Sequence, residues 1–289
     1  MTGTGPVTDP GSAGTGMPPR AGNLALRVVS AAVLAPIAIA AAYYGGFAFT
    51  LFWGLAGIAV LWEWIALVAG GGNRVMFSSC ASALAVAAMV AERHRPTAAV
   101  LVVALGALAA AIFARRERRL WIVSGIGYAA VLLLAPILLR NDQDYGFLAI
   151  LYLFAIVWTT DVLGYFAGRA IGGPKLAPAI SPKKTWSGAI AGALGAMLVT
   201  ALGAQFAGSF NATAIALVAL LLSVMSQLGD LLESWIKRRF GAKDASQLIP
   251  GHGGVMDRLD GFWAAALAGC LIGLARGGMD SAAGGLLVW

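Results

Sequence analysis

The sequence predicts an all-α, polytopic integral membrane protein with about nine transmembrane helices. Two observations support this fold class. First, 60% of the 289 residues are hydrophobic and 11% are charged, with a mean hydropathy of +0.82, which is more apolar side chain than a water-soluble fold could bury. Second, apolar runs long enough to cross a hydrocarbon core, about 20 residues each, recur along most of the chain.

The elements follow in chain order from these runs. Residues 1–22 are rich in Gly, Pro, Thr and Ser, so we expect a disordered cytoplasmic tail and not a signal peptide. An N-terminal transmembrane region of about five spans covers 23–145, and a C-terminal region of about four spans covers 146–289. The predicted spans are 24–44, 47–70, 76–91, 97–114, 120–139, 146–167, 187–208, 211–233 and 261–278.

Two of these spans contain glycine pairs at helical spacing. They are Gly164 with Gly168, and Gly188 with Gly192. Small residues at this spacing let membrane helices approach closely. We therefore interpret the pairs as packing positions.

The basic residues predict the orientation of the spans. With the N-terminus in the cytoplasm, sixteen Lys and Arg lie inside and four, Arg93, Arg95, Arg140 and Arg276, lie outside. The positive-inside rule thus favours a cytoplasmic N-terminus and an odd number of spans in the cell (inner or plasma) membrane. The net charge of +7 then faces anionic lipid headgroups or an anionic soluble substrate. Nucleic acid is disfavoured as a partner, because the basic residues flank spans and form no single stripe.

Carboxylates are the most informative polar groups. Two cysteines and two histidines are too few for a zinc or histidine-rich metal centre. Glu63, Asp161, Asp230 and Glu233 fall within or at the ends of spans, where an ionised carboxylate costs about 2.5 kcal/mol or more at the bilayer centre. Glu63 could equally be functional or be paired with a cation or snorkelling. Asp161 and Asp230 are stronger functional candidates because each precedes one of the two longest cytoplasmic loops.

The second of these loops, GHGGVMDRLDG at 251–261, suggests a metal and phosphate site. Asp257 and Asp260 are spaced i, i+3 at the start of the last span, so they share a helix face. Joined by Asp230, they would form a hard oxygen site suited to Mg²⁺, which prefers one or two carboxylates plus phosphate oxygens. The complementary positive charge for phosphates would come from Lys237, Arg238, Lys243 and Arg258.

Two segments could cradle an anion. Gly251, Gly253 and Gly254 lack Cβ atoms, so their N–H groups can turn inward around an anion. The SPKKT segment at 181–185 offers Lys183 and Lys184 as point charges, with Ser181 and Thr185 as hydroxyl donors at the start of the next span. Anchoring to anionic headgroups is the alternative role of this second segment.

The run SWIKRRFGAKDASQLIPGHGGVMDRLD resembles the signature of the phosphatidate cytidylyltransferases, or CDP-diacylglycerol synthases. The earlier loop is also similar to that family, although Ser187 stands where members commonly have Glu. The resemblance covers about residues 150–275. The signature positions that match are Ser234, Lys237, Arg238, Lys243, Asp244, Ser246, Ile249, Pro250, His252, Gly253, Gly254, Asp257, Arg258 and Asp260.

The resemblance implies a reaction and a site in the C-terminal region. CTP and phosphatidic acid would give CDP-diacylglycerol and pyrophosphate with Mg²⁺, and with K⁺ as a second cation, while the acyl chains stay among membrane lipids. Asp230, Asp257 and Asp260 would hold the metal, with Lys237 and Arg238 also catalytic. The implied substrate-binding residues are Asp161, Ser181, Lys183, Lys184, Thr185, Lys243, Asp244, His252, Gly253, Gly254 and Arg258. His252 could instead be a purely structural loop residue.

Two other functions stay open from the sequence. A CTP-dependent kinase of polyprenol or phytol would need similar basic loops, but it would transfer the γ-phosphate. A cation-coupled transporter could use Asp161 and Asp230 as ion ligands, yet such proteins often contain two repeated halves, and this chain has no convincing repeat. Association into a homodimer is also left open.

Overall fold

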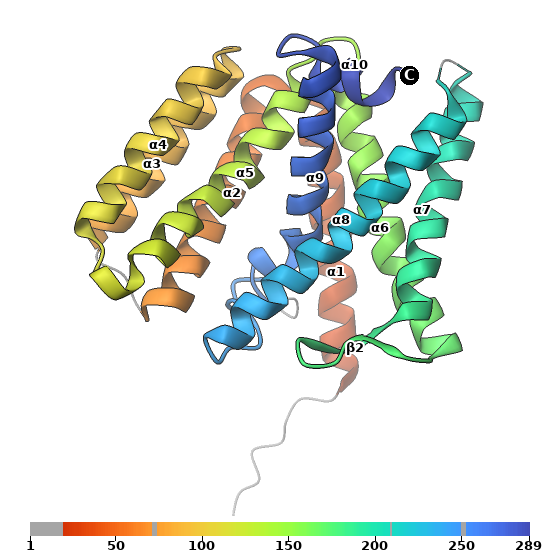
Figure 1. Cartoon of the computed structure of the whole chain (residues 1–289), viewed down its shortest axis with the longest axis horizontal. Coiled ribbons are helices and arrows are strands. Elements are labelled where there is room, and N and C mark those ends of the chain that lie inside the picture. Colours follow the sequence, from red (N-terminus) through yellow and green to blue (C-terminus); the bar gives the residue numbers. More distant parts are fainter. Residues whose placement is uncertain (1–19, 71–73, 209, 250–252) are drawn as a thin grey trace, which may run out of the picture.

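The computed structural model describes residues 20–70, 74–208, 210–249 and 253–289, with the backbone alone at 20–28 and 31. Ten α-helices, one 3₁₀ helix and two short strands make up this part of the chain (Figure 1). Their bounds are α1 Arg20–Tyr44, α2 Gly46–Ala69, α3 Arg74–Glu92, α4 Pro96–Phe113, η1 Arg116–Arg118, α5 Arg119–Arg140, α6 Gly146–Ile171, β1 Lys175–Ala177, β2 Ser181–Thr185, α7 Trp186–Ala207, α8 Ala212–Arg239, α9 Met256–Gly277 and α10 Ala282–Leu287.

Within the described part of the chain, eight helices, α2 to α9, are long and apolar enough to cross a membrane. This confirms a polytopic helical membrane protein. The predicted first span, 24–44, corresponds to α1, whose described apolar part, Ala32–Tyr44, is shorter than a full crossing. Because side chains in the first third of α1 lie outside the described residues, the ninth span stays a prediction.

The all-α fold class is confirmed, and one short hairpin that the sequence did not predict is added to it. Strands β1 and β2 form an antiparallel hairpin between α6 and α7, pairing Lys175 with Thr185 and Ala177 with Ser181. The strands are three and five residues long and have no clear polar–apolar alternation, so the sequence predicted a loop there. The hairpin begins after Gly172 and Gly173, whose φ angles of +68° and +99° end α6.

The helices form layers that bring α9 to the centre. In Figure 1, α3 and α4 lie at one side, α6 and α7 at the other, and α8 crosses in front of the bundle. Two ring stacks fix α9 against α2 and α5: Trp53 on Phe262 at 4.6 Å between centroids, and Tyr128 on Trp263 at 4.5 Å. These contacts hold the first turns of α9 against α2 and α5.

Helices α6 and α7 approach closely at glycines, as the sequence predicted. A Cβ on Gly188 would lie 2.5 Å from the Gly164 carbonyl oxygen, and one on Gly192 would lie 2.6 Å from the Thr160 oxygen. No larger residue fits at either position without moving a backbone. The two helices can therefore form one wall of a site at their ends.

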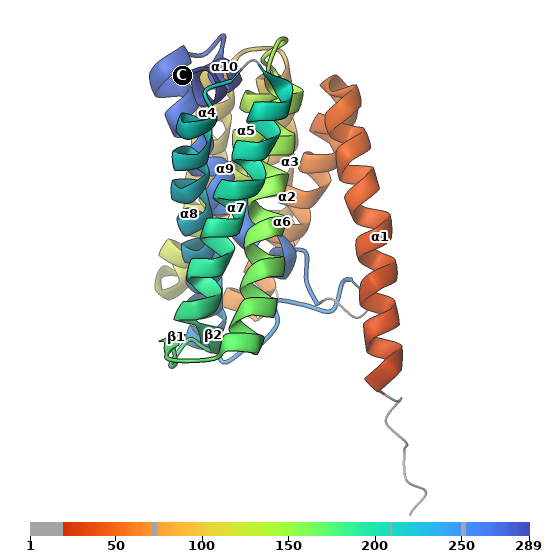
Figure 2. The same ribbon diagram turned by 90° about the vertical axis from the view of Figure 1, so that its right-hand side faces the viewer.

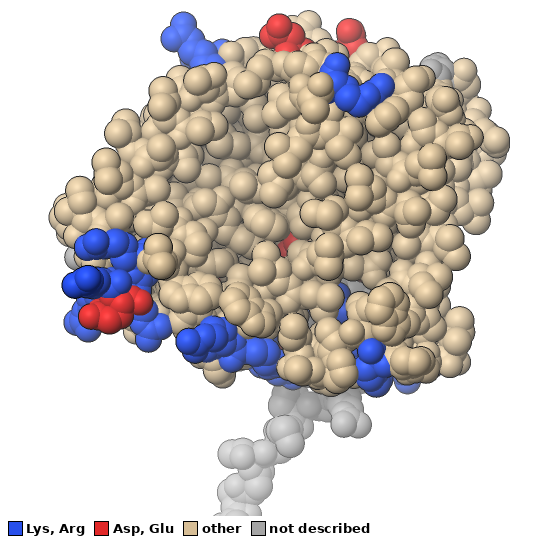
Figure 3. All heavy atoms as spheres, in the orientation of Figure 1, with Lys and Arg blue, Asp and Glu red and all other residues tan. Residues whose placement is uncertain are grey.

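Charged side chains gather at the two ends of the bundle. Figure 3 shows Lys and Arg concentrated along the lower edge, fewer charges along the upper edge, and a band with almost no charged side chains between them. The hairpin lies at the lower end and α10 at the upper end (Figure 2). We call these the hairpin end and the α10 end. An apolar band between two charged rims is what a bilayer requires.

Candidate active site

A cavity of about 650 Å³ lies at the hairpin end, between α6, the hairpin, α7, α8 and α9. The predicted site residues that line it are Asp161, Lys183, Lys184, Thr185, Asp230, Asp257, Arg258 and Asp260. Lining residues that were not among the predicted site residues include Tyr165, Arg169, Lys175 and Gln227. The structure thus brings the two predicted loop regions together in one place.

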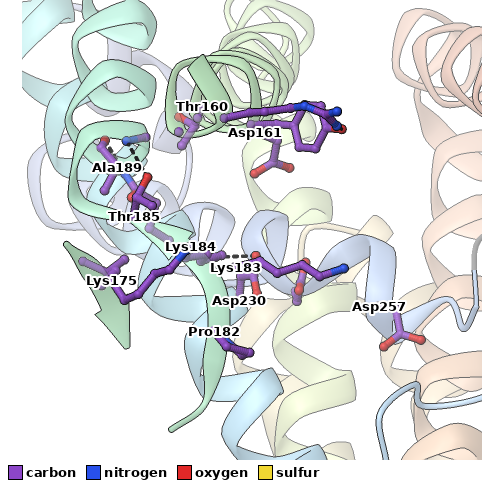
Figure 4. Close-up of a pocket in the computed structure, with 18 of the residues that line it drawn as sticks. Thr160, Asp161, Lys175, Pro182, Lys183, Lys184, Thr185, Ala189, Asp230 and Asp257 are labelled. Carbon is purple, nitrogen blue, oxygen red and sulfur yellow. Dashed lines mark hydrogen bonds and ion pairs between the residues drawn. The ribbon is translucent and has the colours of Figure 1, made fainter. Parts of the chain in front are cut away.

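Three carboxylates from three helices face this cavity. Asp161 on α6, Asp230 on α8 and Asp260 on α9 interact electrostatically with one another. Lys184 reaches from the hairpin to Asp230, with 2.5 Å between Nζ and Oδ2, and Figure 4 shows Asp161 projecting from α6 toward this pair. The cavity is therefore a mixed site in which lysines and carboxylates meet.

The hairpin is fixed to the start of α7 by hydroxyl groups. The Thr185 side chain is buried, and its Oγ1 accepts from the Gly188 N–H at 3.2 Å, which makes Thr185 the N-cap of α7. Ser187 Oγ shares a hydrogen bond with Thr185 and donates to the Gly172 carbonyl at the end of α6. These contacts hold Lys183 and Lys184 at the cavity wall, and the Thr185 hydroxyl is used in capping.

Asp257 is held by the protein on most sides. Its Oδ1 lies 2.5 Å from Lys237 Nζ, and its Oδ2 accepts from the N–H groups of Gly254 at 2.8 Å and Ala245 at 3.0 Å. Lys237 Nζ lies equally close to Glu233 Oε2, at 2.5 Å. Asp257 therefore ties the loop between α8 and α9 to α8 while its side chain also borders the cavity.

Glu63, whose role the sequence left open, contacts this same loop. Its side chain is fully buried on α2 and accepts hydrogen bonds from Ser246 Oγ and from the N–H groups of Val255 and Met256. Among the described residues, Glu63 is therefore neither paired with a cation nor snorkelling to the interface. The groups that hydrogen-bond to it in this part of the chain are neutral donors. The LWEW sequence shows that this carboxylate is unusual. It cannot predict that the partner is Ser246, which lies more than 180 residues away in the chain.

Several predicted site residues lie away from the cavity wall. Arg238, Lys243 and Asp244 are exposed, and Arg238 donates to the Ala242 carbonyl. Ser181 starts β2 without lining the cavity, and Lys237 faces Glu233 and Asp257. Any contact of these residues with substrate stays a prediction.

The loop glycines approach side chains of the protein itself. A Cβ on Gly253 would lie 2.8 Å from Asp257 Oδ2, and one on Gly254 would lie 2.6 Å from Glu63 Oε1. Close contact with these carboxylates therefore explains why both positions are glycine, without any need for a bound anion. Their neighbours Gly251 and His252 lie outside the described residues, and the role of His252 stays a prediction.

The donor chemistry of the cavity fits a hard cation. Carboxylate oxygens are the ligands that Mg²⁺ prefers, and Asp161, Asp230 and Asp260 lie near one another. Across the described residues, no group of three or more His, Cys, Asp or Glu side chains lies so that it could hold a metal ion by itself. Substrate phosphate oxygens and water would have to supply the remaining ligands, as is usual for Mg²⁺.

The fold and the cavity define a class: a multi-pass membrane protein that handles a phosphate-bearing ligand next to the bilayer. Residues 25–272 match the model of the cytidylyltransferase family. The chain belongs to this family, and specifically to its phosphatidate cytidylyltransferases. The match begins at residue 25, so the relationship extends well beyond the 150–275 segment that carried the sequence resemblance.

Individual relatives agree with this assignment. The chain is 42% identical over 246 residues to a phosphatidate cytidylyltransferase of Brucella abortus biovar 1 (strain 9-941), covering 84% of this chain and 91% of the relative. It is 44% identical over 130 residues to that of Haemophilus influenzae, covering 43% of this chain and 45% of the relative. For Staphylococcus haemolyticus the identity is 45% over 124 residues, covering 43% and 46%.

Proposed function

We propose that the cavity at the hairpin end is where this chain converts CTP and phosphatidate into CDP-diacylglycerol and pyrophosphate. Transfer of a cytidylyl group to phosphatidate is the activity of the family to which the chain belongs. The single observation that supports this location is the meeting of Lys183 and Lys184 with Asp161, Asp230 and Asp260 in one cavity. Basic groups and carboxylates together suit polyphosphates that bind with a cation.

The chemistry needs positioning and charge neutralisation more than proton transfer. A phosphatidate oxygen would attack the α-phosphorus of CTP in line, forming a new P–O bond while the bond to pyrophosphate breaks. A phosphate monoester is largely dianionic near pH 7, since its second pKa is about 6, so no general base is obligatory. Lys183 and Lys184 would hold phosphates of the two anionic substrates at the cavity wall.

We propose Asp230, Asp257 and Asp260 as the residues that would hold Mg²⁺, with Asp161 in the same polar site. Bound there, the ion would supply positive charge to phosphate oxygens. A cation there would compete with contacts that the protein already makes: Asp257 accepts from Lys237 and two backbone N–H groups, and Asp230 is paired with Lys184. K⁺ as a second cation and a homodimer stay predictions from the sequence.

The proposed site would face the cytoplasm and receive phosphatidate sideways from the bilayer. The basic side chains at the hairpin end support this orientation through the positive-inside rule. Tyr165 lines the cavity and is 60% exposed on α6, where Phe166 and Leu163 are also exposed. Acyl chains could lie against this apolar surface while the headgroup enters the cavity. The described lining, between residues 160 and 260, lies within the C-terminal region 146–289 that we propose as catalytic.

The test is an assay of the purified protein in detergent with labelled CTP and phosphatidic acid. We expect labelled CDP-lipid and pyrophosphate in the presence of Mg²⁺, with none after chelation and recovery when Mg²⁺ is restored. Release of CDP would indicate a lipid kinase, and no nucleotide turnover with any lipid would indicate a transporter. Comparison of CTP with ATP and dCTP would define the nucleotide.

A further inference from the structure

Glu63 is a buried carboxylate that the proposed chemistry does not use. It lies on α2 in the N-terminal half of the chain and is 0% exposed. Its Oε1 accepts from Ser246 Oγ at 2.6 Å and from the Val255 N–H at 2.8 Å, and its Oε2 accepts from the Met256 N–H at 2.7 Å. Burial of a carboxylate without such donors would be very costly. These three hydrogen bonds are therefore what allows Glu63 to be buried.

Two of these donors belong to the start of α9. The first N–H groups of a helix have no partner within the helix, and Val255, the N-cap residue of α9, makes no capping hydrogen bond with its side chain. Glu63 supplies the missing acceptor from another helix. Its negative charge also lies at the positive end of the α9 dipole. The start of α9 is therefore fixed in space by α2.

The same stretch is held from its other side by Asp257. Ser246, which donates to Glu63, follows Ala245, whose N–H donates to Asp257. Gly254 lies between the two carboxylates: its N–H donates to Asp257, and a Cβ there would lie 2.6 Å from Glu63 Oε1. Glu63 and Asp257 thus clamp the end of the loop directly before the cavity residues of α9.

We propose that Glu63 is a positioning residue for cytidylyl transfer. By fixing Val255 and Met256 it sets the first turn of α9, and with it the places of Asp257, Arg258 and Asp260 at the cavity. Glu63 touches no substrate in this scheme and acts through the loop. The inference rests on the proposed function for its kinetic consequence. Its structural part, the fixing of Ala245, Ser246 and 254–256, stands on the hydrogen bonds alone.

The experiment compares Glu63→Gln with the unaltered protein in detergent. Gln keeps the size of the side chain but replaces one acceptor oxygen by an NH₂ group, which faces N–H donors. We expect kcat to fall at least about tenfold, since small misplacements of catalytic groups cost up to about 100-fold, with a smaller change in KM for CTP. Hydrogen exchange of the 245–257 backbone should also become faster.

Asp142→Asn is the matched control. Asp142 is also a buried carboxylate, at the α10 end, and it accepts from Ser281 Oγ and the Gly284 N–H at 3.1 and 2.8 Å. We expect this variant to lose thermal stability comparably to Glu63→Gln while keeping kcat and the exchange rate of 245–257. A purely structural Glu63 would behave in the same way as this control, and that result would overturn the proposal.

A milder variant covers the case in which Glu63→Gln does not fold. Ser246→Ala removes one donor from a partly exposed loop position and leaves both backbone donors in place. We expect a several-fold loss of kcat with normal folding; unchanged kcat together with unchanged exchange at 245–257 would refute the proposal. If the unaltered protein itself transfers no cytidylyl group, the proposed function fails, and the exchange measurement still decides whether Glu63 fixes the loop.

Discussion

Individual carboxylates in this protein have clearly different surroundings, although the sequence presents them as one set. Asp230 is paired with Lys184, and Asp260 accepts from the Gly261 N–H at 2.7 Å. Asp257 is held by Lys237 and by loop N–H groups. These surroundings distinguish Asp257, which also holds the loop together, from Asp230, which is paired with a lysine of the hairpin.

Replacement of Asp230 by Asn tests the first group. The change removes one carboxylate from the cavity and leaves Lys184 without its ion-pair partner. We expect cytidylyl transfer to fall at least about 100-fold, the usual scale for loss of one electrostatic group at a reacting centre. The thermal midpoint should change little, because the Asp230 side chain is 30% exposed.

Asp144→Asn is the control for this variant, because Asp144 is exposed near the α10 end. It should keep the full rate in the same assay. An Asp230→Asn enzyme that retained more than a tenth of the normal rate would remove Asp230 from the metal site.

Among the described residues, the sequence identified all four acidic residues that line the cavity, but not the reason for the loop glycines. Asp161 and Asp230 were predictable because a carboxylate in an apolar run is costly and needs a purpose, and Asp260 because it shares a helix face with Asp257 at the start of the last span. Gly254 was assigned to a phosphate, whereas the structure places the Glu63 carboxylate beside it. That contact joins residues far apart in the chain, and local spacing contains no information about it.

At the level of elements, the hairpin and its junction with α7 determine where the lysines lie. Ser181 to Thr185 form a strand that ends at the N-cap of the next helix. The hairpin was missed because its strands are too short for a period-2 pattern to be seen. The next helix, by contrast, was predicted within about a residue, since its apolar run and its glycine terminator are both visible in the sequence.

Thr185→Ala tests whether Thr185 serves as a cap. Loss of the oxygen that accepts from Gly188 should destabilise the protein by about 1 kcal/mol, measured by unfolding in detergent with a denaturant. Thr185→Ser keeps a hydroxyl and should restore most of that loss. If Thr185→Ala instead raised KM for CTP without any change in stability, substrate binding would be the main role of this residue.

Gly192→Ala tests the close packing of α6 and α7. Its Cβ would lie 2.6 Å from the Thr160 carbonyl oxygen, so we expect a destabilisation of about 1–3 kcal/mol. Gly203→Ala on the same helix is the control, because its Cβ would meet nothing within 4 Å. That variant should be neutral or more stable by up to about 1 kcal/mol. Equal stability of the two variants would show that the close approach is unimportant.

For the whole molecule, composition and charge predicted a polytopic helical membrane protein. This was possible because a bilayer constrains both the composition and the placement of charge. Apolar runs give the spans and flanking cations give the proposed orientation. The order in which helices pack around α9 was not predictable, since it depends on ring stacks such as Trp53 on Phe262. Such contacts depend on shape and leave no periodic signal in the sequence.

The proposed orientation can be tested with single cysteines. The two native cysteines, Cys80 and Cys270, are buried and can be replaced by Ala. A cysteine at Lys243 near the hairpin end should react with a membrane-impermeant maleimide in inside-out vesicles, and one at Arg93 should react in right-side-out vesicles. The opposite pattern would place the cavity outside the cytoplasm and refute the proposed access of CTP.

The contact between α2 and the start of α9 also bears on how the protein is made. Glu63 enters the membrane early in synthesis, yet its donors at Ser246, Val255 and Met256 emerge 183 to 193 residues later. Until then a carboxylate destined for complete burial has none of its final hydrogen bonds. The active site can therefore be finished only after the last long helix has been inserted, so a nascent chain that stops before α9 contains both proposed lysines of the hairpin but no organised catalytic centre.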